Sequence, residues 1–247
     1  TINPLDIADE FGADALRLAL IVGSTPGNDV KLGREKITAS RNFVNKLWNM
    51  GRYVATSVSP ETLRWDVTSE LSAAKKSEMD FWILSRLAST TKEVTRHLED
   101  YNLSLATELL REFSWNDFAD WYIEIHKIEK NDIVLVHIFN TLLKLWHPSM
   151  PFVTEALYAS LYPSEQRPLM VQSWNTTDQD AIQSVSSFED VLRLITRVRN
   201  IRAIYHIDPK ESLSLTIVGE ESAIAPFSPI IERLGRVSEV LITDAAS

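Results

Sequence analysis

The sequence contains no cysteine in its 247 residues, and only seven of them are glycine. The lack of cysteine excludes disulfides and thiolate metal sites and gives no support to secretion. No stretch approaches the roughly 18 uninterrupted apolar residues of a membrane-spanning helix, and no signal-peptide pattern opens the chain. Apolar residues make up 45% and charged residues 24%, which is typical of a soluble globular protein. Because the sequence begins at Thr1 and not at Met, we expect a piece of a longer chain.

The formal net charge is -9. Taken alone, this charge argues against nucleic-acid binding, which depends on Lys and Arg. A local basic surface can still bind nucleic acid on an acidic protein, so the distribution of the charges matters more than their sum.

Apolar residues recur mostly at helical spacing, which predicts a mainly α protein. We expect one or two short helices over residues 4–22, a loop at 24–29 and a linker over 60–77. Longer helices are predicted at 33–58, 77–98, 104–113, 116–130, 132–146, 152–161 and 188–205. The spacing of Ser77 and Asp80 is that of a capping box. Strands at 213–218 and 237–243, with a short helix from Pro229 between them, indicate a small α/β unit.

The helix around residues 34–54 has two distinct halves when it is projected at about 100° per residue. One half is apolar and consists of Ala39, Met50, Phe43, Val54, Leu47, Val44, Ile37 and Trp48. The other half consists of Arg34, Arg41, Arg52, Asn45, Thr38, Asn49, Asn42, Tyr53 and Lys46. Its one acidic residue is Glu35, in the first turn, where the helix dipole favours a negative charge.

A solvated helix face usually mixes acids with bases. This face instead offers Arg and Lys, which contact phosphates, Asn, which can hydrogen-bond base edges, and a Tyr ring, which can stack on an unpaired base. These residue types are the ones that reading a single-stranded RNA loop requires. A solvated or protein-contacting helix is an equally good interpretation of the pattern alone.

Several motifs resemble those of the valyl-tRNA synthetase family and occur in the same order. They are GADALR at 12–17, GSTPGND at 23–29, RNFVNKLWN at 41–49, WNDFADWYIE at 115–124, HPSMPFVTE at 147–155 and RVRNIR at 197–202. The resemblance covers nearly the whole chain. The isoleucyl and leucyl enzymes share the later motifs more loosely, and the equivalent domain of either remains an alternative.

The resemblance implies a class Ia anticodon-binding helical bundle over residues 33–180. A connecting segment at 1–32 would precede the bundle, and an α/β subdomain at 181–247 would follow it. It also implies anticodon contacts at Lys46, Arg52 and Tyr53, where many relatives have Phe at the last position. With the exposed helix face, the predicted tRNA-binding residues are Arg34, Arg41, Asn45, Lys46, Asn49, Arg52 and Tyr53. A second basic cluster, Arg197, Arg199 and Arg202, could touch the tRNA backbone or face solvent.

The histidine–glycine and lysine–methionine–serine motifs of class I synthetases are absent from the sequence. We therefore expect no catalytic residue, metal or cofactor in this chain, with ATP and Mg²⁺ used by a catalytic domain elsewhere in the parent enzyme. The resemblance implies a cytoplasmic monomer whose partners are tRNA(Val) and its own catalytic domain. The coiled coil that usually ends the family is also expected to be missing. Valine anticodons share their second and third bases, which should therefore matter most for recognition.

Other candidates have plainer interpretations. The aromatic residues Trp115, Phe118, Trp121 and Tyr122 could form a surface on which RNA bases stack, but their spacing favours burial in the core. His126, His137 and His147 lack the short spacing of a zinc helix motif. Asp120 and Glu124 lie on one helix face and could serve as an acid–base pair in a stand-alone enzyme. They are more simply expected to balance Lys127 or to face solvent. A helical protein-interaction or scaffold domain is the remaining alternative, and it would explain the acidic total charge.

Overall fold

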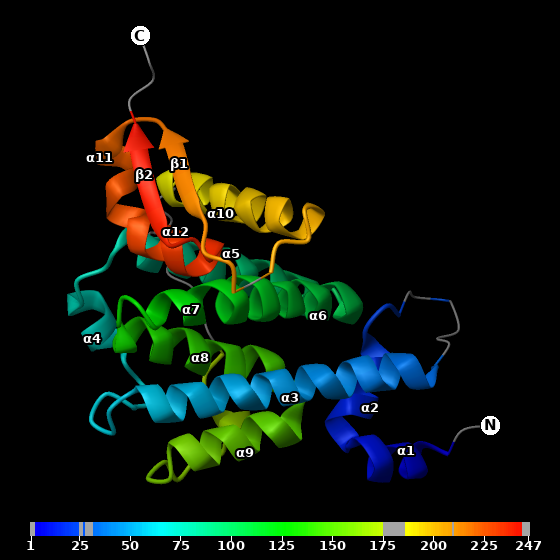
Figure 1. Ribbon diagram of the computed structural model, residues 1–247. Coiled ribbons are helices and arrows are strands. Elements are labelled where there is room, and N and C mark those ends of the chain that lie inside the picture. The colour runs from blue at the N-terminus through cyan, green and yellow to red at the C-terminus, as the bar shows by residue number, and fades with distance from the viewer. Residues whose placement is uncertain (1–2, 25–26, 28–31, 175–185, 209, 244–247) are drawn as a thin grey trace.

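The computed structural model describes residues 3–24, 27, 32–174, 186–208 and 210–243. Within these ranges, helices are layered on one another and a two-stranded sheet lies at one end (Figure 1). The prediction of a mainly α protein that ends in a small α/β unit is confirmed. Most of the loop expected at 24–29 lies outside the described residues. The boundaries at 32 and 180 stay predictions.

Two short helices, α1 (Pro4–Phe11) and α2 (Ala13–Ile21), open the described chain and meet at Gly12, whose φ is 96°. Both pack on the first turns of α3. The carboxylate of Asp14 accepts the backbone N–H groups of Phe152 and Val153, and Arg17 donates to the carbonyls of Pro148 and Ser149. The N-terminal segment is therefore tied to the break that precedes α9.

The longest helix is α3 (Arg34–Ser57), which runs across the molecule with α9 (Pro151–Leu161) below it and α8 (Asp132–Trp146) above it in Figure 1. Its predicted position is confirmed. Gly51 allows the close packing of α3 on these neighbours, since a Cβ there would lie 2.5 Å from Leu157 Cδ2 and 3.1 Å from Phe139 Cζ. Two residues assigned to the apolar half, Ala39 and Trp48, are exposed, because the buried stripe is narrower than half of the helix.

The helix α5 (Glu78–Glu99) begins at the capping box that the sequence predicts, with Ser77 and Asp80 bonded reciprocally. The preceding linker is not wholly irregular, because it contains the short helix α4 (Thr68–Ala73). That helix has no buried residue of its own and packs against α8. Its weak apolar pattern explains why the sequence did not predict it.

The helices expected at 104–113 and 116–130 form one continuous element. The helix α6 (Leu103–Glu112) continues through a π-helical segment, η1 (Phe113–Tyr122), into α7 (Ile123–His126). In η1, Phe118 and Tyr122 are buried, as predicted, whereas Trp115 is 37% exposed and Trp121 is half-buried. The core interpretation is therefore wrong for Trp115, because a π segment shifts the faces that a 3.6-residue period would give.

The C-terminal part begins with α10 (Ser186–Ile204), after the short 3₁₀ helix η2 (Leu169–Val171). The strands β1 (Ser214–Val218) and β2 (Glu239–Thr243) pair in parallel, with Ser214 opposite Glu239. Between them lie α11 (Glu221–Ile224), a 3₁₀ turn (Ala225–Phe227) and α12 (Ser228–Gly235). Phe188 and Phe227 pack together, and Phe188 also meets Trp82 of α5, so this unit shares the core of the bundle.

Among the described residues, none of the helices combines the length and the apolar character that crossing a membrane requires.

Burial of His137 in α8 creates a pH-dependent contribution to stability. Desolvation, helped by Lys144, lowers the pKa of His137 to about 4. As pH falls, the unfolded chain therefore protonates at His137 before the folded protein does. The stability that the neutral His137 contributes is full above the unfolded pKa of about 6.5 and is lost as pH falls toward 4. Between about pH 7 and pH 4, the unfolding free energy of His137→Gln should fall by about 3 kcal/mol less than that of the wild type. Urea unfolding of both proteins across that range measures the difference, and equal losses would contradict it.

Candidate nucleic-acid interface

One arc of α3 carries four polar side chains that have no partner among the described residues. Arg41, Asn45, Asn49 and Arg52 are exposed, and their side chains make no hydrogen bond or ion pair with any residue that the structure describes. On an α-helix they lie within about 80° of one another and span roughly 16 Å along the axis. The opposite face of α3 is fixed in the core by Phe43, Leu47 and Val54. A rigid helix therefore presents two cations and two amides to solvent.

Arg34, at the start of α3, lies apart from this arc. Its guanidinium donates to both carboxylate oxygens of Glu10 in α1, at 3.1 and 2.7 Å, and lies 5.7 Å from the centre of the Phe11 ring. Arg34 therefore ties α3 to the N-terminal helices. The acid that balances it is not on α3, which is why the helix face alone did not reveal it.

Lys46 is also held by another element. Its ammonium nitrogen lies 2.9 Å from Oδ1 of Asp120 and 4.5 Å from the centre of the Trp115 ring, both on η1. The Trp115 ring is in turn stacked on Phe43, with 6.1 Å between centroids. Asp120 is thus the acid that the projection of α3 lacked, and it neutralises the one lysine of the predicted surface.

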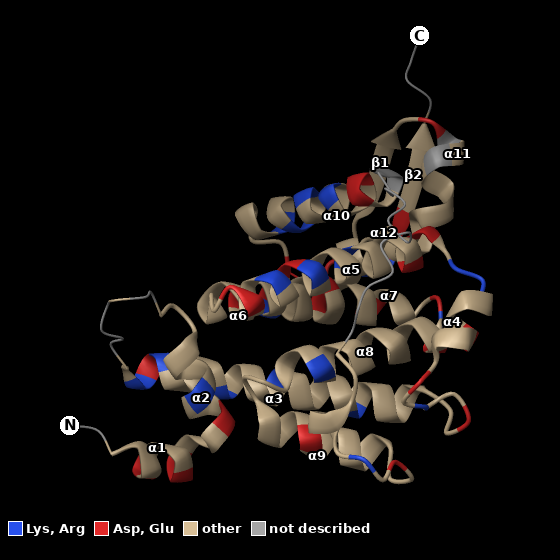
Figure 2. Cartoon of the chain, turned by 180° about the vertical axis from the view of Figure 1, so that it is seen from behind, with Lys and Arg blue, Asp and Glu red and all other residues tan. Residues whose placement is uncertain are grey.

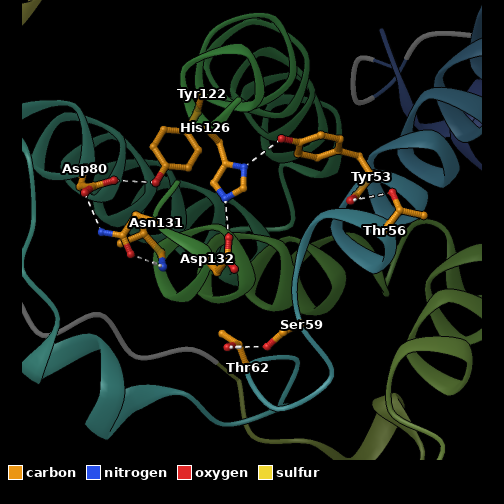
Figure 3. A network of polar contacts seen from close by, with 10 residues as sticks. Tyr53, Thr56, Ser59, Thr62, Asp80, Tyr122, His126, Asn131 and Asp132 are labelled. Atoms are coloured by element: carbon orange, nitrogen blue, oxygen red, sulfur yellow. Dashed lines mark hydrogen bonds and ion pairs between the residues drawn. The ribbon is translucent and has the colours of Figure 1, made fainter. Parts of the chain in front are cut away.

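Tyr53 belongs to a polar network in the interior, shown in Figure 3. Its hydroxyl lies 2.8 Å from Nδ1 of His126, and Nε2 of His126 lies 3.0 Å from Oδ1 of Asp132. Burial lowers the pKa of His126, although Asp132 opposes that shift. Burial also raises the pKa of Tyr53. The ring of Tyr53 is half-buried, with Lys127 5.7 Å from its centre, so it is more constrained than a freely stacking ring.

The three arginines of the second basic cluster have different surroundings. Arg197 is exposed on α10, whereas Arg199 lies 4.5 Å from the centre of the Trp121 ring and donates to the Leu234 carbonyl. Arg202 is 7% exposed, and its guanidinium donates to the carbonyls of Arg236, Asp208 and Glu211. Arg202 holds the C-terminal unit together, and we exclude it from the candidate interface. Figure 2 shows the basic residues of α10 in blue, at several places along the helix.

The remaining sequence candidates are engaged by neighbouring side chains. Glu124 pairs with Lys127, as expected, and Asp120 is engaged by Lys46, so the two carboxylates do not act together. His147 bonds Thr154 at the break before α9. Within the described part of the chain, no group of three or more His, Asp or Glu side chains is placed to hold a metal ion.

Sequence reasoning missed three features of this region: the partners of Lys46, the exposure of Trp115, and Arg236. Arg236 follows α12 in the left-handed conformation, with φ 55° and ψ 48°. One signal was available for the first two, because the density of aromatic and acidic residues at 115–124 is unusual for a plain amphipathic helix.

These elements define a mainly α-helical bundle with a small parallel α/β unit and, on α3, a polar arc that the described residues leave without partners. Residues 80–217 match the family model described as the anticodon-binding domain of tRNA ligase. The chain belongs to this family of tRNA-ligase anticodon-binding domains.

Curated relatives and a solved structure agree with the match. Valine–tRNA ligases of Clostridium perfringens and Clostridium acetobutylicum are each 35% identical to this chain, over 98% and 92% of it. That of Dehalococcoides mccartyi is 33% identical over 98%. The chain spans only 26–29% of the length of these relatives. The ternary complex of Agrobacterium radiobacter K84 agnB2 LeuRS with tRNA and LeuAMS matches 74% of this chain and 22% of that one, with a TM-score of 0.60. At 19% identity, this likeness concerns the fold alone.

Proposed function

We propose that this chain binds the anticodon stem-loop of a valine tRNA as part of a valine–tRNA ligase. The observation that carries the proposal is the exposed arc of Arg41, Asn45, Asn49 and Arg52 on a rigid helix, with no partner for these side chains in the part of the chain that the structure describes. Polar groups held in place without internal partners can bind a ligand without first losing a bond.

Each residue type has a distinct role in the proposed complex. Arg41 and Arg52 hold backbone phosphates of the loop, because guanidinium groups match phosphate oxygens bidentately. Asn45 and Asn49 lie between the two arginines along the helix axis, and their amides donate to and accept from base edges. Lys46 and Tyr53, which are engaged by Asp120 and His126, form the edge of the surface toward η1 and α7.

We also propose that the chain is part of a protein with the activity for which its relatives are named. Their name, valine–tRNA ligase, implies joining valine to tRNA. The use of ATP and Mg²⁺ belongs, in this proposal, to residues outside these 247. The chain here supplies recognition, with its own catalytic domain as its second partner, in a monomeric cytoplasmic enzyme.

The amides of the arc provide the test. We expect a short RNA hairpin with a valine anticodon to bind more tightly than one with the second and third anticodon bases exchanged. The double variant Asn45→Ala, Asn49→Ala should reduce that preference about tenfold, because the two lost base contacts together cost on the order of 1–2 kcal/mol. Fluorescence anisotropy with both hairpins measures it.

Asn200→Ala is the matched control, since Asn200 is exposed on α10 away from the arc. It should leave the preference unchanged. If the double variant keeps the full preference of the wild type, the arc does not read the anticodon.

A further inference from the structure

A groove with a volume of about 740 Å³ lies between the bundle and the C-terminal unit. One wall of the groove consists of Lys46 of α3, Asp120 of η1 and Glu124 of α7. The other wall consists of Arg199 of α10, His206, which follows α10, and Arg236, which follows α12. Lys46 is the neighbour of Asn45 in the sequence and lies at the edge of the arc. The groove therefore extends sideways from the proposed reading surface.

The acids of this groove already have partners. Asp120 is paired with Lys46, and Glu124 is paired with Lys127. The carboxylate of Asp208 accepts the backbone N–H of Lys210 at 2.8 Å. Asp120 and Glu124 therefore each have a lysine beside them, and both also attract Arg199 on the other wall of the groove and raise its pKa.

Two arginines on that wall repel each other. The Arg199 guanidinium is held by the Leu234 carbonyl at 2.8 Å and by the Trp121 ring. Burial lowers the pKa of Arg199 most, and the charge of Arg236 is the next cause. The side chain of Arg236 is exposed and makes no hydrogen bond or ion pair with any described residue. An anion between two such cations removes their repulsion and gains charge-assisted hydrogen bonds.

The backbone at Arg236 is fixed in a conformation that favours glycine. Its φ of 55° costs a non-glycine residue free energy, on the order of 1 kcal/mol. The buried Arg202 donates to the Arg236 carbonyl at 3.0 Å and so stabilises this turn. His206, which also lines the groove, has a φ of 50°. The left-handed conformation of Arg236 is that of a helix C-cap, and it places the Arg236 side chain on the groove wall.

We propose that this groove binds phosphate groups of the RNA strand next to the bases that the α3 arc reads, with Arg236 and Arg199 as the phosphate ligands. The proposal rests on the proposed function, which it deepens by adding a site for the backbone. Asp120 has a positioning role in it, because it keeps the Lys46 ammonium at the junction of arc and groove, 2.9 Å from its carboxylate.

Arg236→Gly tests the groove, because glycine suits the left-handed backbone and removes only the charged side chain. We expect this variant to bind the valine-anticodon hairpin and the base-exchanged hairpin about threefold to tenfold more weakly, by the same factor for both. The slope of log affinity against log salt should become shallower by about 0.7, as for one lost phosphate contact. Arg236→Glu should weaken both further. Lys92→Gln, at an exposed site on α5, should change neither value.

The outcomes are distinguishable. Equal weakening of both hairpins with the shallower slope supports the groove. If the wild type prefers the valine anticodon and Arg236→Gly leaves affinity and slope unchanged, phosphate binding by the groove is contradicted and the proposed function stands. Weakening limited to the valine hairpin would make Arg236 a reader of bases and overturn the phosphate assignment. If the wild type binds neither hairpin at low salt, both proposals fail together.

Discussion

Reversing the two arginines of the α3 arc, with Arg41→Glu and Arg52→Glu together, is expected to weaken hairpin binding about 100-fold at low salt. This is about 2.7 kcal/mol, since each tenfold change corresponds to roughly 1.4 kcal/mol. Both side chains are exposed and without partners among the described residues, so the change removes two phosphate ligands without disturbing the core. The introduced carboxylates also repel the phosphates. Filter binding of the valine-anticodon hairpin across a salt series measures the loss.

The control for this double variant must change the net charge equally. Lys75 and Lys92 are exposed on other parts of the bundle, and Lys75→Glu with Lys92→Glu adds the same negative charge. We expect at most a few-fold effect from that pair. An equal loss from both double variants would mean that total charge, and not the arc, governs binding.

Asp80→Ala is expected to lower the free energy of unfolding by about 3 kcal/mol or more. Asp80 is 5% exposed and accepts from the Tyr122 hydroxyl at 2.6 Å and from the Asn131 amide at 2.7 Å (Figure 3). It also accepts the backbone N–H of Ser77 in the capping box at the start of α5. Its removal leaves the buried Tyr122 hydroxyl without its acceptor and weakens a helix cap in one step.

Urea unfolding of Asp80→Ala beside Asp100→Ala measures this effect. Asp100 follows the last turn of α5, where it is exposed and its side chain pairs with Arg96. Exposed pairs contribute about 0–1 kcal/mol, so Asp100→Ala should stay near the wild type. A loss below about 1 kcal/mol for Asp80→Ala would show that the network does not support the junction of α5, η1 and α8.

Much of the fold follows from local patterns in the sequence. The extent of α3, the Ser77 capping box and the two strands were predictable because helical spacing, cap chemistry and apolar alternation are short-range signals. The continuity of α6 through η1 was not predictable in the same way. A π segment changes the period within one helix, and nothing in the residue types marks where that change begins.

The candidate site could be predicted only in part. The exposed arc follows from the period of α3, but the partners of Arg34 and Lys46 come from Glu10 and Asp120 on other elements. The fate of Arg202 likewise depends on three carbonyls that only the folded turns bring together. The net charge of -9 likewise does not show how acids and bases are distributed over the folded surface. Acids and bases are interleaved over α5 and α6 in Figure 2, whereas the α3 arc has no acid of its own.

The most direct test is to map the RNA contact on the folded protein by NMR. Titration with the valine-anticodon hairpin should shift the side-chain NH₂ signals of Asn45 and Asn49 and the backbone amides of α3 from about residue 41 to 52. The amides of α9, which packs on the other side of α3, should stay unchanged. Shifts confined to α9 or to α5, with the two asparagine signals unmoved at saturation, would contradict anticodon recognition by this arc.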